Sequence, residues 1–230
     1  MPPPSAHSPA LTRGADALLL LTLCFAPLAV GGVYAWAQLG LLLLAALTTL
    51  GGVLERWRAG RHVHAGPLAP PLLLLGALCA LQLVPLPLGV LGAISPAAAE
   101  LLELILVPLG AAGAHPLSLD PPATAVELGK ILLYALIAVA ATRRAHEHRG
   151  RRWLWRAVAL AGVAGLGIAA VQTIANVQRP YGVFGVTPEA FLVSTFVNPN
   201  HAAAFFGIAG FAAAAVALTE RERARAALWA

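Results

Sequence analysis

Six long apolar stretches, each containing few charged residues, constrain this chain more than any other feature. They cover residues 15–33, 37–54, 68–84, 124–142, 153–175 and 201–219. A helix of about 20 apolar residues spans a bilayer, because its backbone polar groups are satisfied within the segment. With 59% hydrophobic and 11% charged residues among 230, the chain has too few polar side chains to cover a water-soluble core. The sequence therefore predicts an all-α integral membrane protein of about six transmembrane helices, forming a single polytopic domain over 1–230.

The positions of the basic residues predict the orientation of these helices. Thirteen of the 15 Lys and Arg residues lie before the first stretch, between the second and third, around the junction of the fourth and fifth, or after the sixth. Six crossings would place them all on one side, and such residues concentrate on the cytoplasmic side of membrane proteins. We therefore expect a cytoplasmic amino terminus, cytoplasmic basic loops, and outside segments at 85–122 and 176–200. The same distribution argues against nucleic-acid binding, since the arginines do not follow one face.

A signal peptide is an alternative interpretation of the first stretch. The stretch ends near Ala35-Trp36-Ala37, a small-residue pattern that resembles a cleavage site. A second apolar stretch follows at once, and no exported soluble domain is predicted, so a retained transmembrane helix is favoured. The later topology is the same in either case.

The two cysteines do not predict a disulfide or a metal site. Cys24 and Cys79 lie within apolar stretches, and neither has a second Cys or a His at metal-ligand spacing. We interpret both as small buried hydrophobic residues. The sequence predicts no metal and no other cofactor.

The first outside segment is predicted to contain a short interfacial helix. Residues 95–107 begin with Ser-Pro, a favourable helix start, but are too few to span a bilayer. Glu100 and Glu103 could form a catalytic carboxylate pair. Their i,i+3 spacing on a short amphipathic helix instead favours a solvent-facing surface.

Charged residues at the start of the fourth stretch also permit two interpretations. Thr124 and Glu127 form a capping-box pattern that predicts the helix start, and Asp120 is interpreted as a turn or cap residue. Glu127 and Lys130 share one helix face within the membrane, where charged residues are often functional. Because i,i+3 pairing near a helix end satisfies both groups locally, we favour a structural ion pair.

Arg179 is set apart from the basic clusters and lies in the second outside segment. It begins the sequence Arg179-Pro180-Tyr181-Gly182-Val183-Phe184-Gly185. Its guanidinium binds two phosphate oxygens at once and keeps its charge at any physiological pH. An aromatic residue and two glycines beside it allow close approach of the backbone. This pattern favours a phosphate or diphosphate ligand.

Asn198, Asn200 and His201 provide neutral donors and acceptors near the expected start of the sixth helix. The N–H groups of a helix start also favour an anion. The alternative is that the asparagines only turn and cap the helix while Arg179 extends to lipid head groups. The chemistry of these residues alone leaves both interpretations open.

Two sequence elements in this region resemble those of a known family. Thr195-Phe196-Val197-Asn198-Pro199-Asn200-His201-Ala202-Ala203 resembles the G-T-F-x-N-x-N-H-x-A signature of the O-antigen ligase and O-antigen polymerase family, which includes related protein O-oligosaccharyltransferases. The element that begins at Arg179 resembles the R-P-[FY]-G-x-F sequence that precedes this signature. Residues 116–124 are similar to the segment before an earlier span of the family.

The resemblance implies a glycosyltransferase of the bacterial inner membrane. Such proteins transfer a glycan from a polyprenyl diphosphate carrier to a glycan or lipid acceptor at the periplasmic face, without a metal. It implies that Arg179 holds the diphosphate, with Asn198, Asn200 and His201 beside it. His201 belongs to the asparagine signature, so we assign no catalytic residue and interpret it as a capping residue.

The chain departs from the family pattern in three respects. Ser194 replaces the first glycine of the signature, residues 186–193 are an insertion, and no outside segment resembles the loop that contains the family's catalytic histidine. Residues 226–230 are typical of the first turn of a seventh span. We therefore expect an amino-terminal part of the family architecture. A transport or flippase subunit for a lipid-linked saccharide and a non-catalytic membrane partner are the alternatives.

Overall fold

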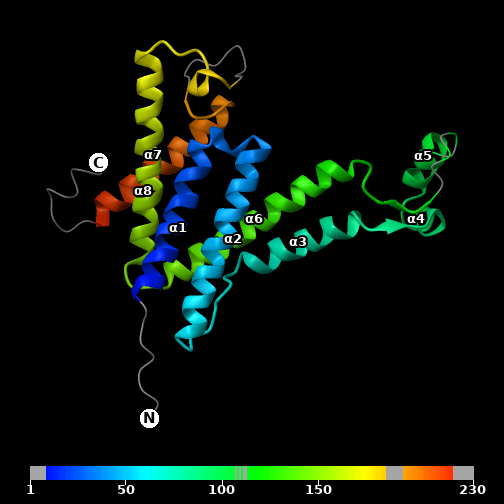
Figure 1. Ribbon diagram of the computed structural model, residues 1–230, viewed down its shortest axis with the longest axis horizontal. Helices are drawn as coiled ribbons and strands as arrows, with labels where there is room; N and C mark the ends of the chain where they lie inside the picture. The colour runs from blue at the N-terminus through cyan, green and yellow to red at the C-terminus, as the bar shows by residue number, and fades with distance from the viewer. Residues whose placement is uncertain (1–8, 107, 109, 111–112, 185–193, 220–230) are drawn as a thin grey trace. The chain divides into compact units, whose positions relative to one another are not determined.

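The computed structural model describes residues 9–106, 108, 110, 113–184 and 194–219 of a mainly helical chain (Figure 1). The predicted insertion at 186–193 and the predicted seventh span at 226–230 lie outside the described residues. The α-helices are α1 Pro9–Leu28, α2 Ala35–Arg58, α3 Ala69–Gln82, α4 Leu88–Ile94, α5 Pro96–Leu106, α6 Pro121–Ala145, α7 Gly150–Ile174 and α8 Pro199–Thr219. Two 3-10 turns, η1 Val30–Gly32 and η3 Pro180–Gly182, and two short strands, β1 Pro85–Leu86 and β2 His115–Pro116, complete the described elements.

Five of the helices are long and apolar enough to cross a membrane: α1, α2, α6, α7 and α8. The third predicted span forms α3, which has 14 residues. At 1.5 Å per residue α3 is about 21 Å long, shorter than the ~30 Å hydrocarbon core. The structure therefore shows five candidate spans where the sequence predicts six.

The chain forms two compact units, residues 1–66 with 136–230 and residues 67–135. In the first unit, α1 and α2 form an antiparallel pair, and α7 packs against both α1 and α8. The chain reverses between α1 and α2 at Gly31 and Gly32, which have φ values of 66° and 70°. Glycine adopts this left-handed region without strain, so two adjacent glycines permit the tight reversal.

Small and polar side chains fill the interior of the first unit. Thr22 and Thr48 meet between α1 and α2 with their hydroxyl oxygens 3.2 Å apart, and each also donates to its own helix backbone. Gly162 of α7 lies directly against Ala209 of α8, an arrangement that lets membrane helices approach closely. Large apolar side chains point outward instead, as at Phe211, which is 81% exposed. This outward apolar surface is what lipid-facing helices present.

The second unit contains α3, α4, α5 and the first part of α6. Gly76 of α3 faces the side chains of Leu128 and Ile131 on α6, and β1 pairs with β2 in antiparallel register. Helix α5 confirms the predicted short helix that begins after Ser95. Its glutamates are exposed, as the solvent-facing interpretation expects. Helix α4, which precedes it, is not predicted from the sequence.

The start of α6 corrects one prediction. The helix begins at Pro121, and the Asp120 carboxylate accepts a hydrogen bond from the Ala123 N–H at 3.0 Å. The predicted cap at Thr124 is therefore wrong, because this side chain lies inside the first turn and contacts the Ser118 hydroxyl at 2.7 Å. The interpretation of Asp120 as a cap residue is confirmed.

Candidate functional site

Arg179 lies beyond the carboxyl end of α7 with an extended backbone, φ −141° and ψ 147°. Its side chain is exposed, and within the described residues it has neither an ion pair nor a hydrogen bond. Long basic side chains without an acidic partner are free to bind an external anion. Among the described residues, nothing covers the Arg179 guanidinium, which the sequence predicts to bind a diphosphate. We call this part of the first unit the Arg179 end. It comprises residues 172–184, residues 194–201 and the turn at 28–36.

The turn that follows Arg179 is anchored at two points. The N–H of Tyr181 donates to the side-chain oxygen of Gln172 in α7 at 2.6 Å, and the Tyr181 hydroxyl donates to the Leu28 carbonyl at the end of α1. The Gly182 N–H closes the turn on the Arg179 carbonyl at 2.8 Å. Burial raises the pKa of the Tyr181 hydroxyl above its ordinary value. These bonds fix the backbone that positions the guanidinium.

Aromatic rings hold the same segment against the α1–α2 turn. The ring of Phe184 lies 5.0 Å from that of Tyr34 and 6.4 Å from that of Trp36, measured between centroids. Trp36 also makes an edge contact with Phe25. Aromatic residues with polar tips gather where a membrane meets water. The cluster is therefore suited to interfacial depth.

The asparagine signature contacts the same turn as the segment that follows Arg179. Ser194 and Thr195 are buried, and Phe196 packs on Phe205 and against Gly31, where any side chain would collide with its ring. The two sequence elements that suggested the family resemblance thus both contact residues 28–36, although 15 positions separate Arg179 from Ser194 in the sequence.

The three other predicted ligands have different roles at the start of α8. The Asn198 side-chain oxygen accepts the Asn200 N–H at 2.9 Å, and its backbone oxygen accepts the Ala202 N–H at 3.2 Å. The capping interpretation is confirmed for Asn198. The side chains of Asn200 and His201 are exposed in the first turn and have no hydrogen bond within the described ranges. The capping interpretation of His201 is therefore wrong, because Asn198 caps this helix. Asn200 and His201 remain predicted ligands.

Two buried polar atoms at the Arg179 end were not predicted as part of the site. The Gln172 amide nitrogen and the Thr195 hydroxyl have no hydrogen-bond partner in the described part of the chain, and these residues are 5% and 0% exposed. An unsatisfied buried polar group costs about 1–3 kcal/mol, so such groups usually bind water or a ligand. The sequence feature that could have pointed to Gln172 is its position as a single polar amide near the end of an apolar stretch.

Charged residues form a second cluster at the opposite end of the first unit. Arg143 is 3% exposed and lies 2.9 Å from Glu147, 3.7 Å from Glu55 and 3.6 Å from Asp16. Arg144 lies 3.1 Å from both Asp16 and Glu147. The network was not predicted from the sequence, because its members come from the first apolar stretch, the loop after the second and the loop after the fourth. It joins α1, α2 and α6, and we call this end of the unit the basic end.

The other residues singled out in the sequence are an ion pair and two cysteines. Lys130 and Glu127 pair with each other at 2.7 Å, as the structural interpretation expects. Cys24 and Cys79 are free, half-buried thiols. Within the described residues, no group of three or more His, Cys, Asp and Glu side chains could hold a metal.

Comparison with known proteins assigns no family and no function to the chain. No protein family, no curated protein and no solved structure matches the chain.

Proposed function

We propose that the Arg179 end binds the diphosphate of a polyprenyl-linked glycan, and that the protein acts in glycan transfer as the O-antigen ligase and polymerase resemblance implies. The observation that supports this most is the exposed Arg179 guanidinium, which has no partner in the described residues and stands on a firmly anchored turn. A guanidinium held in this way offers a planar pair of donors to two phosphate oxygens.

The neighbouring groups suit the rest of a diphosphate. The orphaned amide nitrogen of Gln172 is a hydrogen-bond donor, and so is the hydroxyl of Thr195. The first-turn N–H groups of α8 carry partial positive charge. One cation with several neutral donors stabilises the charge of a diphosphate leaving group where water is scarce. We assign no catalytic residue; the acceptor would be a second glycan or a lipid.

The depth of the site also fits a lipid-linked substrate. Helix α7 has 25 residues, so the Arg179 end lies about 37 Å from the basic end along its axis. The aromatic cluster of Tyr34, Trp36 and Phe184 marks a membrane surface at this end. A polyprenyl diphosphate keeps its chain in the lipid and its charged group at that surface.

The transport alternative has less support. A transport path needs polar groups near the middle of the membrane. In the described spans, the Thr22 and Thr48 hydroxyls there donate to the carbonyls of their own helices, while the buried charges around Arg143 lie at the basic end. A non-catalytic partner role would be favoured by co-purification with a second chain that contains a histidine-bearing loop.

A complementation experiment tests the proposed function. Arg179→Ala should abolish restoration of the surface polysaccharide in the host lacking this protein, while the amount of protein in the membrane stays unchanged. Arg58→Ala is the matched control, because Arg58 is exposed at the end of α2 and has no ion pair in the described structure. Full restoration by Arg179→Ala would overturn the assignment.

A further inference from the structure

Helix α6 contains an ion pair that the proposed function does not use. The Lys130 ammonium lies 2.7 Å from the Glu127 carboxylate. Lys130 follows the start of α6 at Pro121 by about 14 Å along the helix axis and precedes Arg143 by about 20 Å. Helix α6 is one of the five helices that are long and apolar enough to cross a membrane. The pair therefore lies inside a candidate span rather than at one of its ends.

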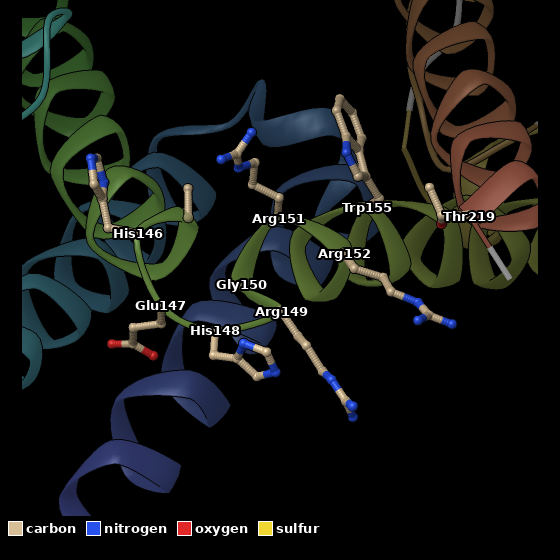
Figure 2. A pocket seen from close by; sticks show the side chains of 10 residues that line it. His146, Glu147, His148, Arg149, Gly150, Arg151, Arg152, Trp155 and Thr219 are labelled. Atoms are coloured by element: carbon tan, nitrogen blue, oxygen red, sulfur yellow. The ribbon is translucent and has the colours of Figure 1, made fainter. Parts of the chain in front are cut away.

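The loop after α6 marks a membrane surface at the far end of this helix. Figure 2 shows the side chains of Arg149 and Arg151 extending to opposite sides at the start of α7, and both are exposed. Basic side chains gather where a membrane helix meets water. Lys130 is separated from these arginines by more than three turns of α6, so the ion pair does not belong to that surface.

Glu127, Lys130 and Tyr134 form what we call the polar face of α6. Residues at positions i, i+3 and i+7 share one face of a helix. The side chains of Glu127 and Lys130 are 59% and 31% exposed, and Tyr134 is 55% exposed. Leu128 and Ile131, by contrast, face α3. The polar face is therefore not the face by which α6 packs within the second unit.

The polar face has hydrogen-bonding capacity that the described residues leave unused. The Lys130 ammonium bonds to one carboxylate oxygen of Glu127, Oε1, so the second oxygen and two ammonium protons are available. The Tyr134 hydroxyl has no hydrogen bond to a described residue. Charged side chains within membrane helices usually meet one another or line a polar interior. Lipid chains cannot complete these bonds, whereas a polar partner can.

The charges of the polar face are complementary to themselves. In a two-fold dimer the two contact surfaces are identical, so a residue of one copy meets a different residue of the other copy reciprocally. Two copies inserted in the same orientation hold Glu127 at the same depth, and Lys130 lies only about 4.5 Å away along the axis. A lysine side chain is long enough to cover that offset. A second copy thus supplies an opposite charge for each member of the pair.

We propose that a second copy of this chain packs against the polar face of α6 through two reciprocal Glu127–Lys130 bonds, which form a two-fold dimer in the membrane. An anionic lipid would satisfy Lys130 but not Glu127. The polar face belongs to the second unit and Arg179 to the first, so the dimer does not depend on glycan transfer at the Arg179 end.

Energy transfer between fluorescently labelled copies of the full chain in phosphatidylcholine vesicles tests the proposal. The unaltered chain should self-associate. Glu127→Lys creates two positive charges on the face and Lys130→Glu two negative ones, so each variant alone should self-associate about tenfold more weakly. Donor-labelled Glu127→Lys mixed with acceptor-labelled Lys130→Glu should recover the association. Glu100→Lys is the control, because it makes the same charge change at an exposed position of α5 in the same unit.

Three results would overturn the proposal. The first is energy transfer by the unaltered chain no greater than random proximity gives. The second is association of both charge-reversal variants equal to that of the unaltered chain, which would place the contact elsewhere. The third is a mixture that associates no better than either variant alone.

A neutral variant covers the case in which the charge reversals prevent insertion. Glu127→Gln with Lys130→Met removes both charges from the span, which favours insertion into the membrane. Its self-association should still be about tenfold weaker than that of the unaltered chain. Unchanged association in this variant would also contradict the proposal.

Discussion

The N–H of Tyr181 donates to the side-chain oxygen of Gln172 at 2.6 Å, and this bond joins the turn after Arg179 to the last turns of α7. Gln172 is buried, and its amide nitrogen has no partner within the described residues. One side chain thus positions the candidate ligand through its oxygen and offers a donor through its nitrogen.

Gln172→Leu should release the turn at Tyr181. The substitution removes the acceptor of the partly buried Tyr181 N–H, and a bond of this kind contributes about 1 kcal/mol. Hydrogen exchange of a peptide covering residues 176–184 should therefore become about fivefold faster. Gln178→Leu is the control, because Gln178 is exposed and, among the described residues, its side chain bonds only to Asn176. Equal exchange in both variants would show that the bond does not hold the turn.

Tyr181→Phe should lower stability at neutral pH and alter the response to alkali. The hydroxyl donates to the Leu28 carbonyl, a bond expected to contribute about 0.5–1.5 kcal/mol. The pKa of this hydroxyl is raised in the folded state. Its contribution is therefore complete below the unfolded pKa of about 10 and is lost as pH rises through the folded value.

Thermal unfolding of this variant between pH 7 and 11 checks the prediction. The difference between the unaltered protein and Tyr181→Phe should be constant up to about pH 10 and diminish above it. Tyr34→Phe keeps the ring that packs on Phe184 and should follow the unaltered protein. A difference that grows with alkali would contradict the stated direction.

Arg143→Met should destabilise the first unit by about 3–5 kcal/mol. The substitution leaves Asp16, Glu55 and Glu147 close together with less positive charge, and unpaired buried charges are costly. Unfolding in mixed micelles measures the change. Arg58→Met, at an exposed position, should shift the free energy of unfolding by less than about 0.5 kcal/mol. Similar effects of the two substitutions would exclude a structural role for the network.

Two glycines of α7 should respond to alanine in opposite directions. At Gly162 a methyl group would collide with Ala209 of α8, and overpacking of this kind costs about 1–3 kcal/mol. At Gly167 nothing lies within 4 Å, so alanine should stabilise the helix by up to about 1 kcal/mol. Melting temperatures of the two variants, measured side by side in one detergent, test the α7–α8 interface; a stabilising Gly162→Ala would contradict it.

The helices could be predicted from the sequence because hydropathy is a local property. Each predicted apolar stretch forms a helix, but α3 ends at Gln82, shortly before Pro85 and Pro87, since the residue before a proline avoids helical backbone angles. The start of α6 was misplaced because two capping patterns compete within a few residues. There the Asp120 carboxylate caps the helix, while Thr124 bonds to Ser118 instead.

The site could be predicted only in part. Arg179 was identifiable because its charge is isolated in the sequence. The burial of Gln172 and Thr195 depends on helices that meet only in three dimensions, and no local pattern encodes it. The same holds for Glu55 and Arg143, which are 88 positions apart in the chain and pair across two helices.

Direct binding of a short polyprenyl diphosphate tests the central proposal. Titration of farnesyl diphosphate into the purified full chain in nanodiscs should give saturable binding, with farnesyl monophosphate weaker by about tenfold or more. Arg179→Ala should abolish the preference for the diphosphate, Arg179→Lys should restore only part of it because an ammonium cannot bind two oxygens in one plane, and Arg58→Ala should leave it intact. Equal affinity of Arg179→Ala and the unaltered protein for farnesyl diphosphate would contradict the proposed role of this residue.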